Sequence, residues 1–208
     1  MKTLLHVVAA PRGEESRTLK VADAFLAAFV STHSDWKIDT LNLFDEPLPE
    51  LTVKSISGKY ALLSGKDLTG ELKDSWKEII KKIERFISAD GYLVSSPMWN
   101  FSIPYRLKHY IDIILQPKYL FQYTANGPEG LLKNRKMVVV TSRGGDYSAG
   151  EAKKYDFQEP YLRTVFGLAG ITDITFINAQ PMDAMGGEIC QQKIKEAQAL
   201  ARTTAKDF

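Results

Sequence analysis

Short apolar runs alternate along this chain with longer segments whose apolar residues recur every three or four positions. This order predicts an α/β fold: a doubly wound, five-stranded parallel sheet with helices on both faces. The near-continuous apolar character of the first run indicates a strand buried on both sides, whereas polar alternation in the second indicates an edge strand. The expected strands are residues 2–9, 36–41, 91–96, 137–141 and 174–177, and the expected helices are residues 16–30, 72–88, 104–115, 157–167 and 188–202.

Length and charge narrow the class of protein. A chain of 208 residues supports one sizeable core, so residues 1–208 are expected to form a single domain. Its 27 Lys and Arg nearly balance 25 Asp and Glu, which argues against a nucleic-acid partner. The lone Cys190 makes neither an internal disulfide nor a zinc cluster, which suits a reducing compartment. Residues 45–70 are rich in Pro, Ser and Gly and indicate a loop with at most one short helix.

The first residues, MKTLLHVVAAPRGEES, have only a superficial likeness to a secretory leader. The apolar run is short, His6 interrupts it, and Pro11, Arg12 and two glutamates follow at once. We therefore expect a buried first strand. Because no apolar stretch approaches the roughly 20 residues that cross a bilayer, we expect a soluble, cytoplasmic protein without a membrane partner.

Three stretches that packing does not explain follow predicted strands: APRGEESRT after the first, SSPMWNFS after the third and SRGGDY after the fourth. In open parallel sheets, ligands bind outside the carboxyl ends of the strands, where the strand order reverses. If the order is 2-1-3-4-5, the first, third and fourth strands are neighbours. The three loops would then meet at one rim and form one site.

The first of these loops suits an anion. It places Ser16, Arg17 and Thr18 at the start of a helix, where backbone NH groups lack intrahelical acceptors and the helix dipole favours negative charge. The alternative is that Ser16 only caps the helix and Arg17 is solvated. No dinucleotide fingerprint and no nucleotide P-loop motif occurs in the sequence.

The other two loops suit a flat ligand. Gly144 and Gly145 leave room for close approach to the backbone, and Tyr147 could cover the ligand, although a glycine pair also forms plain turns. In the third-strand loop, apolar side chains lie beside polar backbone between two restraining prolines, which is typical of a small-ligand pocket. The alternative is that its two aromatic side chains fold back into the core. The residues of this loop are Pro97, Met98, Trp99, Asn100 and Phe101.

The motifs PMWNFSIPYRLKHYID, NGPEGL and SRGG, in this order and spacing, together with AGITD and ADAF, resemble the family of FMN-dependent NADH azoreductases. These enzymes are relatives of the flavodoxin-like quinone reductases, and the resemblance covers nearly the whole chain. It implies a flavodoxin-like fold, bound FMN, and NADH as co-substrate. It also implies a homodimer with the active site at the interface, because one face of the FMN needs covering.

By this resemblance, Ser16, Arg17 and Thr18 hold the FMN phosphate. The third-strand loop lines the isoalloxazine ring and its NH groups donate to it, while Ser142, Arg143, Gly144 and Gly145 contact the pyrimidine edge and the other side of the ring. The family usually has Ser where this chain has Ala10, so one phosphate hydroxyl is missing, at a cost of about 1 kcal/mol. Tyr123 and Leu168 match positions around the substrate, partly from the second subunit; Leu168 stands where an aromatic is often found.

The reaction that the resemblance implies is ping-pong electron transfer: NADH reduces the FMN and leaves, and a quinone or azo compound then takes the electrons. His6, His33 and His109 do not cluster, so we predict no catalytic side chain and no metal ligand. An alternative is a flavin-binding electron carrier or redox-sensing module, which the near-neutral charge argues against. A regulatory domain without flavin would need a phosphate-accepting Asp after the third strand, and SSPMWN has none.

Overall fold

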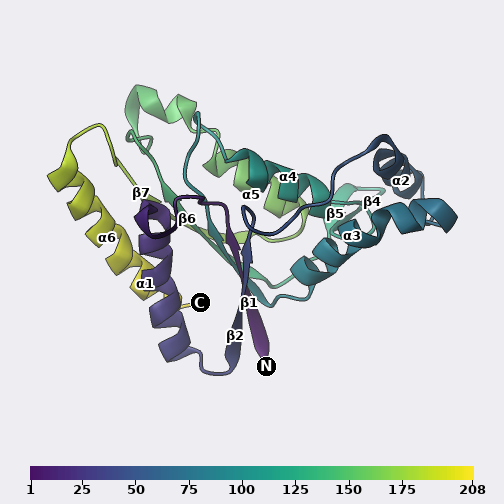
Figure 1. The fold of residues 1–208 in the computed structure, drawn as a ribbon, viewed down its shortest axis with the longest axis horizontal. Coiled ribbons are helices and arrows are strands. Elements are labelled where there is room, and N and C mark those ends of the chain that lie inside the picture. Colours follow the sequence, from purple (N-terminus) through teal and green to yellow (C-terminus); the bar gives the residue numbers. More distant parts are fainter.

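The computed structural model describes residues 1–208 and contains the predicted parallel sheet (Figure 1). Its order is β2-β1-β3-β6-β7, and a small antiparallel hairpin of β4 and β5 lies outside it. This order differs in chain numbering from the predicted 2-1-3-4-5 because the hairpin inserts two strands before the fourth strand of the sheet. The strands are β1 (Lys2–Val8), β2 (Trp36–Asn42), β3 (Gly91–Ser95), β4 (Phe121–Thr124), β5 (Gly127–Gly130), β6 (Lys136–Ser142) and β7 (Asp173–Ala179).

Helices cover both faces of the sheet (Figure 1). Successive residues of β1 join different cores: Leu4 packs with α1 and α6, and Leu5 packs with α3, α4 and α5. This two-sided burial is the reason that β1 is buried at every position from Leu4 to Val8 and, apart from His6, apolar there. No helix combines the length and the apolar character needed to span a membrane. The longer helices are α1 (Arg17–Thr32), α3 (Gly70–Ile87), α4 (Tyr105–Ile114), α5 (Glu159–Leu168) and α6 (Gly187–Lys206).

The segment predicted as a loop with at most one short helix contains one eleven-residue helix, α2 (Val53–Leu63). Tertiary contacts hold it: the indole Nε1 of Trp76 donates a 2.9 Å hydrogen bond to the Ser55 carbonyl, and Gly58 lies directly against the same ring. Turn-forming residues before α2 make this amphipathic helix difficult to recognise from the sequence. Two short 3-10 helices, Gly13–Glu15 and Gly150–Tyr155, lie in the loops that precede α1 and α5.

A close backbone approach attaches the β4–β5 hairpin to the body of the protein. A Cβ on Gly130 would overlap the Gly170 nitrogen and lie 2.5 Å from the Ala169 carbonyl carbon. We expect Gly130→Ala to lower the free energy of unfolding by about 1–3 kcal/mol, because backbone must move to admit the methyl group. Urea denaturation measures the change. The matched control, Gly167→Ala in α5, has open space around it and should be neutral or slightly stabilising; equal midpoints for the two variants would contradict the argument.

Candidate active site at the carboxyl rim of the sheet

The three loops singled out in the sequence meet in one cleft at the carboxyl ends of the strands, beside the start of α1. A fourth loop, after β7, contributes one wall. The cleft has a volume of about 170 Å³, which is smaller than the roughly 300–1,000 Å³ of a site that encloses a whole ligand. Its lining residues are Ala10, Pro11, Arg12, Ser16, Arg17, Thr18, Pro97, Met98, Trp99, Ser142, Arg143, Gly144, Met182 and Asp183.

The start of α1 forms one end of the cleft. The backbone NH groups of Arg17 and Thr18 donate to no acceptor in the protein, as expected for a helical first turn. The Ser16 hydroxyl accepts a 3.2 Å bond from the NH of Leu19, so Ser16 does cap the helix. The Thr18 and Ser142 hydroxyls are 2.7 Å apart, which ties the start of α1 to the end of β6. This end of the cleft therefore presents free amide donors held in place by buried hydroxyl contacts.

Arg17 is not simply solvated. Its Nη1 lies 2.5 Å from a carboxylate oxygen of Asp183, which follows β7 and lines the same cleft. The backbone NH of Asp183 in turn donates to the Gly144 carbonyl at 3.0 Å, which holds the acidic loop against the glycine loop. Sequence reasoning missed Asp183, because nothing in its local sequence separates it from an ordinary loop acid.

The third-strand loop turns sharply and exposes its aromatic side chains. Reciprocal 2.9 Å backbone bonds join Trp99 and Ser102, and the two residues between them have left-handed backbone, with φ of 47° at Asn100 and 68° at Phe101. Such angles are unfavourable for residues other than glycine and occur most often at functional sites. The NH groups of Asn100 and Phe101 have no acceptor in the protein.

Trp99 is 38% and Phe101 45% exposed, so the alternative in which these side chains join the core is wrong. Phe101 packs edge-on against Tyr147, with ring centroids 6.2 Å apart. Asn100, Phe101, Gly145 and Tyr147 lie outside the lining of the cleft itself. Trp99 belongs both to the cleft and to the neighbouring open groove that contains Asn100.

Neither of the two glycines after β6 has a positive φ. Their contribution is therefore the space left by the missing side chains. A Cβ on Gly144 would lie 3.1 Å from the Asp183 carboxylate, and a Cβ on Gly145 would lie 3.3 Å from the Tyr147 ring. Larger residues would therefore push apart the walls that these two side chains form.

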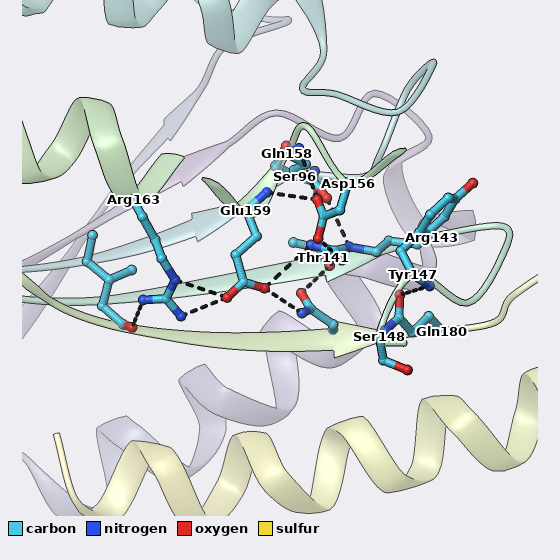
Figure 2. Close-up of polar contacts among 12 residues, drawn as sticks. Ser96, Thr141, Arg143, Tyr147, Ser148, Asp156, Gln158, Glu159, Arg163 and Gln180 are labelled. Carbon is cyan, nitrogen blue, oxygen red and sulfur yellow. Dashed lines mark hydrogen bonds and ion pairs between the residues drawn. The ribbon is translucent and has the colours of Figure 1, made fainter. Parts of the chain in front are cut away.

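Arg143 lines the cleft, but its side chain is buried beneath the rim and points toward Asp156 and Gln158 (Figure 2). The guanidinium Nη1 lies 2.8 Å from Asp156, and Nε donates to the side chains of Gln158 and Thr141 at 3.2 and 3.1 Å. The predicted contact of Arg143 with a ring edge would therefore have to come from its backbone. Asp156 and Gln158 carry no motif and could not have been identified from sequence.

The two residues expected around a substrate lie elsewhere. Tyr123 is 67% exposed on the β4–β5 hairpin, which projects away from α1 (Figure 1). Leu168 is the last residue of α5 and is partly buried. Neither lines the cleft of this single chain.

His6 lies in β1, is almost fully buried, and its Nε2 is 2.8 Å from the Ser95 hydroxyl. Burial lowers the pKa of its imidazole from 6.5 to about 4, so it is neutral at pH 7.

The structure has no cluster of three His, Cys, Asp or Glu side chains arranged for a metal ion. The chemistry that the rim itself offers is therefore an amide-rich anion site beside an exposed aromatic turn.

The fold and this rim define a flavodoxin-like protein, and a family model described as flavodoxin-like fold matches residues 2–204. An FMN-dependent NADH:quinone oxidoreductase of Nitratidesulfovibrio vulgaris is 38% identical, with 100% of each chain covered. Another, of Ruegeria pomeroyi, is 41% identical over 87% of this chain and 90% of that protein. This chain thus belongs to the family of FMN-dependent NADH:quinone oxidoreductases, in agreement with the resemblance noted in its motifs.

Solved structures agree with this assignment. An azoreductase from Bacillus anthracis superposes with a TM-score of 0.90 at 29% identity and 100% coverage of both chains. An FMN-dependent NADH-azoreductase from the same organism, determined in complex with FMN, gives a TM-score of 0.85 at 29% identity, covering 99% of this chain and 100% of that one.

Proposed function

We propose that this chain binds FMN at the rim cleft and passes electrons from NADH to quinones and aromatic azo compounds, one substrate after the other. The observation that carries the proposal is a cleft with free helix-end amides at Arg17 and Thr18, next to an exposed turn whose amides at Asn100 and Phe101 have no acceptor. Trp99 joins the two, because it lines both the cleft and the neighbouring groove. The spacing of these donors along one rim suits a ligand with an anionic tail and a polar, planar head.

The phosphate end fits in most respects. Free NH groups and a helix dipole favour an anion there, and Arg17 adds positive charge. Ala10 removes one hydroxyl donor, and the Asp183 carboxylate competes for Arg17. Both features weaken the site without closing it, so we expect modest affinity for FMN.

The ring end fits as well. When bound, FMN supplies the acceptor for hydride and the donor of electrons. This chain would hold the ring through amide donors at Asn100 and Phe101, the exposed indole of Trp99, and the space left by Gly144 and Gly145. Stacking and apolar fit would then dominate substrate choice, so we expect many flat electrophiles to react.

We further propose a homodimer with the active site at the interface. A cleft of about 170 Å³ leaves a flavin ring open on one side, and aromatic side chains around it are exposed, among them Tyr105 at 65% and Phe157 at 58%. A second copy would cover this surface, and Tyr123 and Leu168 would complete the substrate pocket, partly from that second subunit. Sedimentation that shows a fully active monomer would contradict this arrangement.

Absorption spectroscopy tests the function directly. Purified protein should be yellow, and it should oxidise NADH when a quinone is added. Initial rates at several quinone concentrations should give parallel double-reciprocal lines, as ping-pong kinetics requires. A colourless preparation that FMN does not reconstitute would overturn the proposal. Bound flavin without turnover of NADH with any small acceptor would favour an electron carrier instead.

The carboxylate of Asp183 should oppose the phosphate. We expect Asp183→Asn to bind FMN roughly two- to fivefold more tightly, because Arg17 is released from an exposed ion pair worth at most about 1 kcal/mol. Fluorescence titration with FMN measures this gain. Riboflavin, which lacks the phosphate, should show no gain, and neither should the charge-matched control Asp74→Asn on an exposed position of α3. Equal gains for FMN and riboflavin would contradict the role given to Asp183.

A further inference from the structure

One buried side chain holds the beginning of the third-strand loop. Gln158 is fully buried at the start of α5, and its Nε2 donates to the Ser96 carbonyl at 3.1 Å (Figure 2). The same Nε2 also donates to the Pro97 carbonyl at 3.0 Å. These two carbonyls lie just before the turn that exposes Trp99. The NH groups of Ser96 and Met98 continue the pairing with β6, and the glutamine amide binds the two carbonyls beside them.

The same segment also holds the end of the turn. The backbone NH of Phe157 donates to the Phe101 carbonyl at 3.0 Å. Both ends of the loop from Ser96 to Phe101 are therefore bonded to two consecutive residues, Phe157 and Gln158. Movement of this short segment would move the whole turn.

Charged partners set the orientation of the Gln158 amide. Arg143 donates to its Oε1 at 3.2 Å, and since a guanidinium has no acceptor, the NH2 group must face Ser96 and Pro97. Asp156 fixes the backbone, because its Oδ1 accepts from the NH groups of Gln158 and Glu159 at 3.0 and 3.1 Å. The amide is thus held on both sides in one orientation.

The turn needs such support. Two consecutive residues with left-handed backbone are intrinsically unfavourable, and they persist only where the surroundings determine them. Their NH groups, at Asn100 and Phe101, are the ones that have no acceptor in the protein. The 2.9 Å bond from the Met98 NH to the Ser142 carbonyl restrains the start of the turn, and the bonds from Gln158 and Phe157 add restraints at both of its ends.

We propose that Gln158 is a positioning residue for electron transfer: its amide holds Ser96 and Pro97 so that the amides of Asn100 and Phe101 point to the ring-binding side of the cleft. This inference rests on the proposed function and concerns the same site. Gln158 itself is buried and would touch neither FMN nor substrate.

The isosteric variant Gln158→Glu isolates this contact. It keeps the size of the side chain and the oxygen that accepts from Arg143, but it turns the donor to Ser96 and Pro97 into a second carboxylate oxygen. We expect roughly tenfold weaker FMN binding, on the basis of two lost hydrogen bonds. We also expect a more negative FMN reduction potential, because misaligned amides stabilise the reduced ring less, and a lower kcat with little change in KM for NADH.

A matched control is available in α4. Gln116 is equally buried, and its Nε2 donates to the Asp112 and Ile113 carbonyls at 2.6 and 3.1 Å, away from the loop. Gln116→Glu should lose stability in the same way and leave the FMN affinity and potential unchanged. If Gln158→Glu does not fold, Gln158→Met, which lacks the donor but carries no charge, takes its place and should show the same three changes.

The outcomes separate the two proposals. One outcome overturns the positioning role and leaves the function intact: the wild-type protein binds and reduces FMN, and the Gln158 variants have the same FMN affinity and potential as Gln116→Glu. Wild-type protein that binds no FMN would overturn the function and the inference with it. A changed potential in the Gln158 variants alone supports both.

Discussion

Replacing Arg143 with methionine should lower the free energy of unfolding by about 3–5 kcal/mol, because it leaves a buried carboxylate without its partner. The Arg143 side chain is 1% and that of Asp156 11% exposed, and their contact is 2.8 Å. Two more bonds, to Thr141 and Gln158, would be lost with the guanidinium. Denaturation with urea at pH 7 measures the change.

Two further variants show whether the loss comes from the unpaired charge. Asp156→Asn in the Arg143→Met background removes the orphaned carboxylate and should recover part of the stability. Arg143→Lys keeps the positive charge but loses the planar guanidinium group with its several NH donors. Its free energy of unfolding should therefore lie between those of wild type and Arg143→Met. Arg143 already has one unsatisfied atom, Nη2, whose nearest carboxylate oxygen is on Glu159 at 3.8 Å. A loss below about 1 kcal/mol would show that the network is not a structural support.

Acid should destabilise this protein through His6. Its folded-state pKa of about 4 lies below the value of 6.5 for the unfolded chain, so the unfolded state binds more protons between these pH values. Stability is therefore unaffected by His6 above pH 6.5 and falls as the pH decreases toward 4. The expected loss at pH 4 is about 3 kcal/mol. The cause is burial in β1, where Ser95 offers a hydroxyl but no carboxylate to stabilise an imidazolium.

The variant His6→Gln isolates this effect. It keeps a polar contact for the Ser95 hydroxyl but has no titrating group in this pH range. Carboxylates that protonate in the same range affect both proteins equally, so the difference between the two curves of unfolding free energy against pH belongs to His6. This difference should grow by about 3 kcal/mol between pH 6.5 and 4. Parallel curves would contradict it.

The five strands of the parallel sheet, most helices and the three rim loops were predictable from sequence because the signals are local. Two-sided burial makes a strand apolar throughout, as at Leu4 and Leu5, and a helix start needs a capping residue, as at Ser16. The loops contain residues that packing does not require, such as Trp99 and the pair Gly144 and Gly145, and these residues identified the loops as candidate binding segments. The family resemblance in the motifs then pointed to FMN.

The structure alone located α2, because the contact of Trp76 with Ser55 and Gly58 stabilises it from outside its own sequence. It alone placed Asp183 beside Arg17, 166 positions apart in the chain. It also showed that the Arg143 side chain points toward Asp156 beneath the rim.

Sequence therefore determined the five strands of the sheet, its longer helices and the loops that carry unusual residues, since apolar periodicity, capping and turn chemistry act over a few positions. Tertiary structure decided which polar side chains pair, and so which line the cleft and which support it. Gln158 and Ser96 illustrate the reason: they are 62 positions apart, and only the folding of α5 against the end of β3 brings donor and acceptor together.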